Sequence, residues 1–121
     1  MDITEHLISP SYHRKPDFIS GERISDFSWK CKCCNSTEDI TFEMAADAYW
    51  KSSIKLSEEE HSVLNKIFGI GYVGKSHDGG SPHFMDTKCK KCEQSYMIYL
   101  GIKEPNNSCL HITIQAISLW N

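Results

Sequence analysis

The sequence predicts an α+β fold, in which an antiparallel β-sheet carries one or two inserted helices. Three observations lead to this prediction. Apolar residues alternate along two C-terminal stretches, one amphipathic segment opens with a capping box, and two cysteine pairs each follow an apolar stretch. Alternation with a period of two is typical of strands, whereas a repeat at i, i+3 and i+4 is typical of helices.

Length and charge limit the class of protein. The chain has 121 residues and a formal net charge of −3 at pH 7. This length suits one domain over residues 1–121, with an irregular N-terminal segment at 1–22 and a core at 23–121. The acidic balance disfavours a general nucleic-acid binder, which must neutralise phosphates. We find no signal-peptide pattern and no apolar run of the ~20 residues that a membrane span needs, so we expect a cytoplasmic protein without a membrane partner.

The first expected elements are strands. Residues 24–29 alternate, with Phe27 and Trp29 on one face. A second strand within 38–44 can pair back onto the first. After it, residues 44–54 contain helix-forming alanines and indicate a short helix.

The clearest helix is expected to follow Ser57. This serine is a good N-cap, and Glu60 completes a capping box three residues later. Gly69 is a natural C-terminal stop. The glycine-rich stretch after it predicts a loop, or a short strand at 70–73 followed by a loop.

The end of the chain predicts a β-hairpin. Apolar residues alternate along 96–104 and again along 109–120, and Pro105–Ser108 supplies turn residues between them. A further strand is expected near residues 84–88.

Cysteines are concentrated in two pairs with C-x-x-C spacing, Cys31 with Cys34 and Cys89 with Cys92. A tight turn with two intervening residues aims both sulfurs at one point, and its amides can donate hydrogen bonds to thiolates. Two such turns supply four thiolates for a tetrahedral Zn²⁺ ion, with Zn–S bonds of about 2.3 Å. In a reducing compartment such pairs hold metal more readily than they form disulfides. The sequence therefore predicts a structural zinc site made by these four cysteines.

The stretches around the pairs, DFSWKCKCC and FMDTKCKKCEQSYMIYL, place each pair after a predicted strand. This arrangement resembles a zinc ribbon, in which two knuckles each cap a β-hairpin. The resemblance covers about residues 24–43 and 84–120, with a helix inserted between, and implies a zinc-ribbon-like core. Glycine often follows the second cysteine of a knuckle, where the backbone adopts positive φ. Asn35 can substitute for it here, and Glu93 does so less easily.

The same four ligands argue against catalysis. A catalytic zinc keeps an open position for water or substrate, and four thiolates leave none. We therefore predict that the protein is not an enzyme. Cys33 could replace Cys31 or Cys34 as a ligand, although the C-x-x-C choice is better supported, and Cys109 is expected to be a buried or edge thiol. Iron can use the same ligands, but the proline and glycine residues that surround each pair in rubredoxin-like sites are missing.

Two other motifs lack the structural context that their function requires. GIGYVG at 69–74 matches a dinucleotide fingerprint in letters, but it follows a helix and precedes residues that cannot be helical. His77, Asp78 and His83 lie between the cysteine pairs, as in an HNH-type nuclease. The ββα element and the additional ligand of that motif cannot be placed, so a solvated loop is the better interpretation.

The last third of the chain, CKKCEQSYMIYLGIKEPNNSCLHITIQAISLW, resembles small bacterial zinc-ribbon proteins of the toxin-immunity type. The resemblance rests on the C-x-x-C, the aromatic strand after it, the EPNN turn and the ITIQAI strand. It implies a non-catalytic protein-binding module whose partner is another protein, a cognate toxin. An acidic protein steers well onto a basic active site. Exposed acidic residues at 58–60 and the loop at 77–82 are the expected contact residues.

A nucleic-acid-binding zinc ribbon is the alternative function, and an HNH-like nuclease is the third. The alternative rests on lysines close to the two cysteine pairs: Lys30, Lys32, Lys88, Lys90 and Lys91. Such a ribbon would show affinity that falls steeply with salt.

Overall fold

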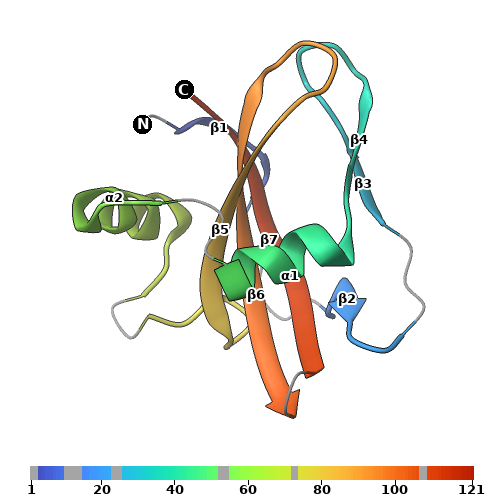
Figure 1. Cartoon of the computed structure of the whole chain (residues 1–121). Helices are drawn as coiled ribbons and strands as arrows, with labels where there is room; N and C mark the ends of the chain where they lie inside the picture. The colour runs from blue at the N-terminus through green and yellow to red at the C-terminus, as the bar shows by residue number, and fades with distance from the viewer. Residues whose placement is uncertain (1–2, 10–14, 23–25, 52–54, 72–73, 107–108) are drawn as a thin grey trace.

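The computed structural model describes residues 3–9, 15–22, 26–51, 55–71, 74–106 and 109–121. Antiparallel β-strands make up the largest share of this part of the chain, and two helices pack against the sheet (Figure 1). The predicted combination of antiparallel sheet and inserted helices is therefore present.

The elements follow one another along the chain in the order β1 (Ile3–Ile8), β2 (Phe18–Ile19), β3 (Phe27–Lys30), β4 (Thr37–Ile40), α1 (Phe42–Lys51), α2 (Glu58–Phe68), β5 (Ser81–Lys88), β6 (Ser95–Asn106) and β7 (Cys109–Trp120). Strands β3 and β4 form a separate two-stranded sheet, and all other strands belong to the main sheet.

The main sheet is built on the β6–β7 hairpin that the alternating pattern predicts. Its strand order is β1-β7-β6-β5, and β2 also pairs with β7. Ile102 lies opposite Ile112 in the hairpin, and Ile98 lies opposite Ile117. Residues 107–108 of the expected turn, and residues 72–73 of the expected short strand, lie outside the described residues.

Both faces of the main sheet are covered. On one face, β6 and β7 side chains such as Ile98 and Ile114 pack with Ala45 of α1 and Ile40 of β4. On the other face, Tyr99 and its neighbours pack with the α2 residues, including Phe68. Each buried apolar side chain of this size stabilises the fold by about 1.5–3 kcal/mol relative to exposure.

Helix α2 has the ends that its sequence predicts. The Ser57 hydroxyl accepts from the Glu60 N–H at 3.1 Å, and the Glu60 carboxylate accepts from the Ser57 N–H at 3.1 Å. Gly69 ends the helix with φ of 70°. Among the described residues, neither helix has the length and apolar character needed to cross a lipid bilayer.

Helix α1 begins earlier than expected, at Phe42, and β4 is correspondingly shorter than the strand expected within 38–44. The Thr41 hydroxyl accepts a hydrogen bond from the backbone N–H of Met44 at 3.2 Å. This local cap offers the chain a helix start directly after Ile40. The strand and helix patterns overlap in this stretch, so composition alone did not place the boundary.

The N-terminal segment differs from the expectation that residues 1–22 are irregular. Ile3–Ile8 forms β1, which pairs antiparallel with the end of β7, and Phe18 of β2 is fully buried opposite Ile112. Both short strands depend on β7, which is about a hundred residues away in the sequence. Local patterns carry little information about such distant pairing.

Candidate metal centre

The first cysteine pair lies in the turn between β3 and β4. The Asn35 N–H donates to the Cys31 carbonyl at 2.8 Å, and the Cys31 N–H donates to the Ser36 carbonyl at 2.9 Å. Asn35 has φ of 60°, as expected for the position after the second cysteine. These bonds fold the turn so that Cys31 and Cys34 face the same point.

The turn between β5 and β6 repeats this geometry. The Glu93 N–H donates to the Cys89 carbonyl at 2.9 Å, and the Cys89 N–H donates to the Gln94 carbonyl at 2.9 Å. Glu93 has φ of 64°, so it adopts the left-handed conformation despite its side chain. We call these two turns the knuckles, residues 31–36 and 89–94. They lie together at the end of the molecule where the β3–β4 hairpin and the β5–β6 hairpin turn (Figure 1). These are the two hairpins that the knuckles join.

The four predicted cysteines converge. One sulfur from each of Cys31, Cys34, Cys89 and Cys92 lies within 4.8 Å of all the others. The Cys31–Cys92 sulfur distance is 3.6 Å and the Cys34–Cys89 distance is 3.5 Å. A tetrahedral ion with Zn–S bonds of about 2.3 Å separates its sulfurs by about 3.8 Å. The spacing therefore fits such an ion, and it is too long for a disulfide.

Exposure differs among the four cysteines. Cys31 and Cys89 are each 1% exposed, Cys34 is half-buried, and Cys92 is exposed. The first cysteine of each knuckle thus faces the protein, and the cluster opens to solvent on the Cys92 side.

Tyr96 supports the buried side of the cluster. Its hydroxyl donates to the Cys31 sulfur at 3.1 Å and accepts from the Lys32 N–H at 3.1 Å. Burial, followed by this hydrogen bond, raises the pKa of Tyr96, so the phenol keeps the proton that it donates. The Trp29 ring packs edge-on against Tyr96 with 4.4 Å between centroids. Because Tyr96 belongs to β6, one hairpin positions a sulfur of the other.

Two further polar groups join the knuckles. The Ser36 hydroxyl lies 3.1 Å from the Cys34 sulfur and 3.2 Å from the Cys89 sulfur. The Glu38 carboxylate, on a side chain that is almost fully buried, accepts from the Lys90 N–H at 2.9 Å. The Ser36–Cys89 contact and the Glu38–Lys90 bond cross from one hairpin to the other, so both stabilise the arrangement of the sulfurs.

The ionisation of the sulfurs favours a bound cation. Burial acts to raise the pKa of Cys31, but hydrogen bonds from Tyr96 and from the Cys34 and Cys33 amides lower it to about 6. For Cys92 a bond from the Gln94 amide acts to lower the pKa. Burial and the three neighbouring sulfurs outweigh it and raise the pKa to about 12. Four adjacent sulfurs cannot all become thiolates without a compensating positive charge, which a divalent ion supplies.

The remaining cysteines lie outside the cluster. Cys33 is exposed, and its sulfur is 3.6 Å from the Gln94 side-chain oxygen. Cys109 is the first residue of β7, opposite Asn106. The structure therefore gathers the C-x-x-C pairs and leaves Cys33 outside the group of four sulfurs.

The residues considered for a nuclease have separate structural roles. The His77 ring nitrogen bonds the Tyr99 hydroxyl at 2.8 Å, and Asp78 bonds the Ser76 hydroxyl and the Gly80 amide. His83 was expected in a loop, but it lies in β5 with its ring against Tyr49 of α1. In the part of the chain that the structure describes, the four cysteines alone form a group of three or more potential metal ligands.

Sequence reasoning missed the groups that support the sulfurs: Tyr96, Ser36 and Glu38. A weak signal was available, since all three lie within seven residues of a cysteine pair. Their roles depend on how the two hairpins face each other, which no local pattern contains. No protein-family model matches the chain, and comparisons with curated proteins and with solved structures give no significant match.

Proposed function

We propose that this chain is a non-catalytic protein-binding module in which Zn²⁺ joins two β-hairpins. The observation that carries the proposal is the convergence of four cysteine sulfurs within 4.8 Å. Four thiolates complete a tetrahedral shell and leave no position for a reactant. Zinc in such a site contributes to folding directly and does no chemistry.

The zinc-ribbon assignment is part of this proposal. Two hairpins whose turns share the same backbone hydrogen bonds and meet at four sulfurs support it. Metal analysis of protein purified without added metal should find one zinc per chain. Iron in its place, or less than a tenth of an equivalent of any metal, would contradict the proposed site.

We further propose that the binding partner is a toxin and that the protein acts as its immunity protein. The net charge of −3 and an exposed tryptophan support a surface that binds a basic protein. Calorimetric titration against the product of the neighbouring gene should give a dissociation constant below the micromolar range. The absence of binding at micromolar concentrations counts against the immunity role. Plasmid nicking that is abolished by His83→Ala would contradict the non-catalytic assignment.

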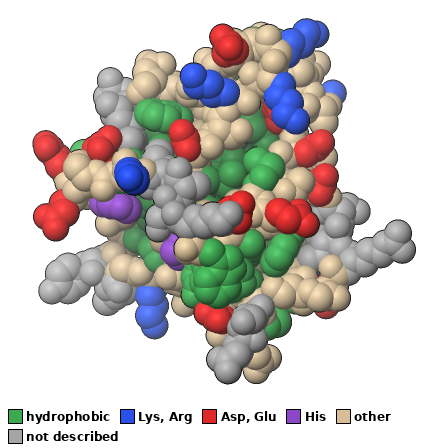
Figure 2. All heavy atoms as spheres, viewed as in Figure 1, with side chains coloured by type: hydrophobic (Ala, Val, Ile, Leu, Met, Phe, Trp, Pro, Cys, Tyr) green, Lys and Arg blue, Asp and Glu red, His purple; other side chains and the backbone are tan. Residues whose placement is uncertain are grey.

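Nucleic-acid binding is a second candidate, because lysines gather around the knuckles. The side chains of Lys30, Lys32, Lys88, Lys90 and Lys91 are all exposed. Figure 2 shows basic side chains at the same end of the molecule. Lys32 contacts Glu5, which reduces its availability for phosphates. The logarithm of the association constant for a DNA duplex should then fall linearly with the logarithm of the salt concentration, with a slope of about −0.9 per phosphate contact. A flat salt response removes this candidate.

A further inference from the structure

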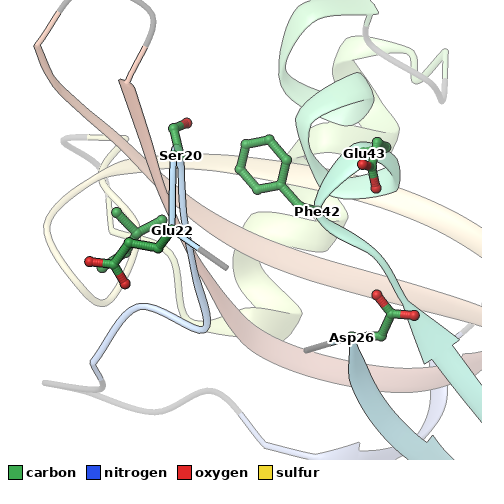
Figure 3. Close-up of a pocket in the computed structure, with 7 residues that line it drawn as sticks. Ser20, Glu22, Asp26, Phe42 and Glu43 are labelled. Carbon is green, nitrogen blue, oxygen red and sulfur yellow. The ribbon is translucent and has the colours of Figure 1, made fainter. Parts of the chain in front are cut away.

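A hollow lies between the turn after β2 and the start of α1. It encloses about 290 Å³. Its lining residues come from these two segments and from the residue before β3: Ile19, Ser20, Gly21, Glu22, Asp26, Phe42 and Glu43. Figure 3 shows Ser20 and Glu22 on one side, Asp26 and Glu43 on the other, and the Phe42 ring between them.

The lining combines negative charge with an apolar wall. Glu22, Asp26 and Glu43 are exposed carboxylates, and no salt bridge joins any of them to another described residue. Phe42 is half-buried, and the edge of its ring packs with Phe18 at 6.4 Å between centroids. A carboxylate rim suits a guanidinium or ammonium group. The face of a phenyl ring suits both the cation and the methylene stem behind it.

The outer face of α1 continues this surface. Glu43, Asp47 and Trp50 are spaced at i, i+4 and i+7, so they share one side of the helix. Trp50 is 56% exposed, the largest exposed fraction among the large hydrophobic side chains described. In the view of Figure 2, acidic side chains lie beside a hydrophobic patch in the region where Figure 1 places α1.

Trp50 packs against a neighbouring ring that is itself held in place. The Tyr49 ring packs edge-on against it at 4.8 Å between centroids, and the Tyr49 hydroxyl donates to Glu104 at 2.8 Å. Exposed tryptophan carries a large share of the binding energy in many protein interfaces. A held tryptophan loses little conformational entropy when a partner covers it.

The acidic start of α2, which the sequence places among the expected contact residues, has a role within the helix. Glu60 is engaged in the capping box, and Glu58 and Glu59 sit at the positive end of the helix dipole. These carboxylates stabilise α2 itself. Among the described residues of α2, none lines the hollow.

We propose that the α1 face, defined as Glu43, Asp47 and Trp50 together with the hollow beside it, receives a basic segment of a partner protein. One arginine or lysine side chain enters the hollow between Glu22, Asp26 and Glu43. The partner's neighbouring apolar side chains cover Trp50. This inference rests on the proposed protein-binding function and specifies where that function is located.

The hollow is tested with a small probe on the zinc-loaded full chain. Backbone amide NMR signals are followed while N-acetyl-arginine methylamide is added, with N-acetyl-glutamate methylamide as the charge control. We expect saturable shifts at Glu22, Asp26, Phe42 and Glu43 with the arginine probe alone. Shifts that do not saturate, or equal shifts with the glutamate probe, overturn the proposal.

Two double variants distinguish binding by the carboxylates of the hollow from a general effect of negative charge. Asp26→Asn/Glu43→Gln should weaken binding of the arginine probe at least fivefold. Glu58→Gln/Glu59→Gln removes the same charge from α2 and should leave the affinity within twofold. Equal weakening in both variants overturns the proposal, because long-range charge would then explain the binding. Unchanged amide spectra away from the substitutions establish that each variant is folded.

These experiments distinguish a failure of the proposed binding location from a failure of the proposed function. Saturable probe binding with no binding to the neighbouring gene product leaves the hollow as a cation site and removes the immunity role. If that product binds equally well to the wild type, to the Asp26→Asn/Glu43→Gln variant and to Trp50→Ala, the protein-binding function stands and the location proposed here is overturned.

Discussion

The Tyr96 hydroxyl lies 3.1 Å from the Cys31 sulfur and donates a hydrogen bond to it. Tyr96 belongs to the hairpin of the second knuckle, and Cys31 belongs to the first. The same hydroxyl also accepts from the Lys32 amide. One phenol therefore stabilises a thiolate and satisfies a backbone donor across the contact between the two hairpins.

Replacing Tyr96 by phenylalanine should weaken zinc binding. The ring remains to pack against Trp29, but the Cys31 thiolate loses a donor and the Lys32 amide loses its acceptor. Groups that position metal ligands typically change affinity 10–100-fold, so we expect a loss of about tenfold. Competition with a chromogenic chelator measures it. Tyr99→Phe is the matched control, since Tyr99 bonds His77, and equal losses in both variants would contradict a specific role for Tyr96.

The variants Cys92→Ser and Cys33→Ser distinguish a zinc ligand from a cysteine that does not bind the metal. Both residues are exposed, so neither substitution creates a cavity. Loss of the Cys92 thiolate opens the metal shell, and zinc content should fall well below one equivalent after dialysis against a weak chelator. Cys33→Ser should keep full zinc content, because its sulfur points to Gln94. Zinc loss in the Cys33 variant would mean that this cysteine is a ligand.

Removing the metal should loosen the β3–β4 hairpin before the main sheet. Among the described residues, that hairpin shares no strand pairing with the main sheet. It is joined to the second knuckle by the sulfurs, by Glu38 and by Tyr96. Amide hydrogen exchange after chelation should be at least tenfold faster in β3 and β4, while the β6–β7 amides stay protected. Uniform loss of protection would show instead that zinc is required for the whole fold.

The sequence predicted those parts of the protein in which neighbouring residues carry the information. The capping box of α2 and the alternation of β6 and β7 act within one element. The C-x-x-C spacing acts within one turn, so the four cysteines could be named in advance. The pairing of β1 with β7, the Glu38–Lys90 bond and the position of Tyr96 depend on contacts between distant segments. The pattern of residues within one element does not predict these contacts.

Glu93→Gly should stabilise the protein. Glu93 has φ of 64° in the second knuckle, where a side chain is strained and glycine is not. The left-handed conformation costs a non-glycine residue about 1–2 kcal/mol. After allowance for the more flexible unfolded chain, we expect a gain of about 1 kcal/mol, which raises the melting temperature of the zinc-loaded protein by about 4 °C. Asn35→Gly is the control and should change little, because asparagine tolerates φ of 60°. A lower melting temperature for Glu93→Gly would show that its side chain makes a stabilising contact.

Gln115→Leu should also stabilise the protein, for a different reason. Gln115 is fully buried in β7 at a register shift opposite Tyr99 and Leu100, where Ala116 and Ile114 take the pairings on either side. Neither polar atom of its side chain has a hydrogen-bond partner among the described residues. Burying an unsatisfied amide costs about 1–3 kcal/mol in proteins, and leucine has a similar volume without that cost. Chemical denaturation of the zinc-loaded chain should therefore show a gain of about 1–2 kcal/mol.

Gln115→Glu is the companion variant, because it keeps the shape of the side chain and adds a charge. Burial of that charge should destabilise the fold by several kcal/mol or force the carboxyl to remain protonated, with a pKa raised by burial. The two variants should therefore move the unfolding midpoint in opposite directions. A loss of stability in Gln115→Leu would instead reveal that the amide binds a water molecule or another buried polar group, and that the β7 bulge needs a polar side chain at this position.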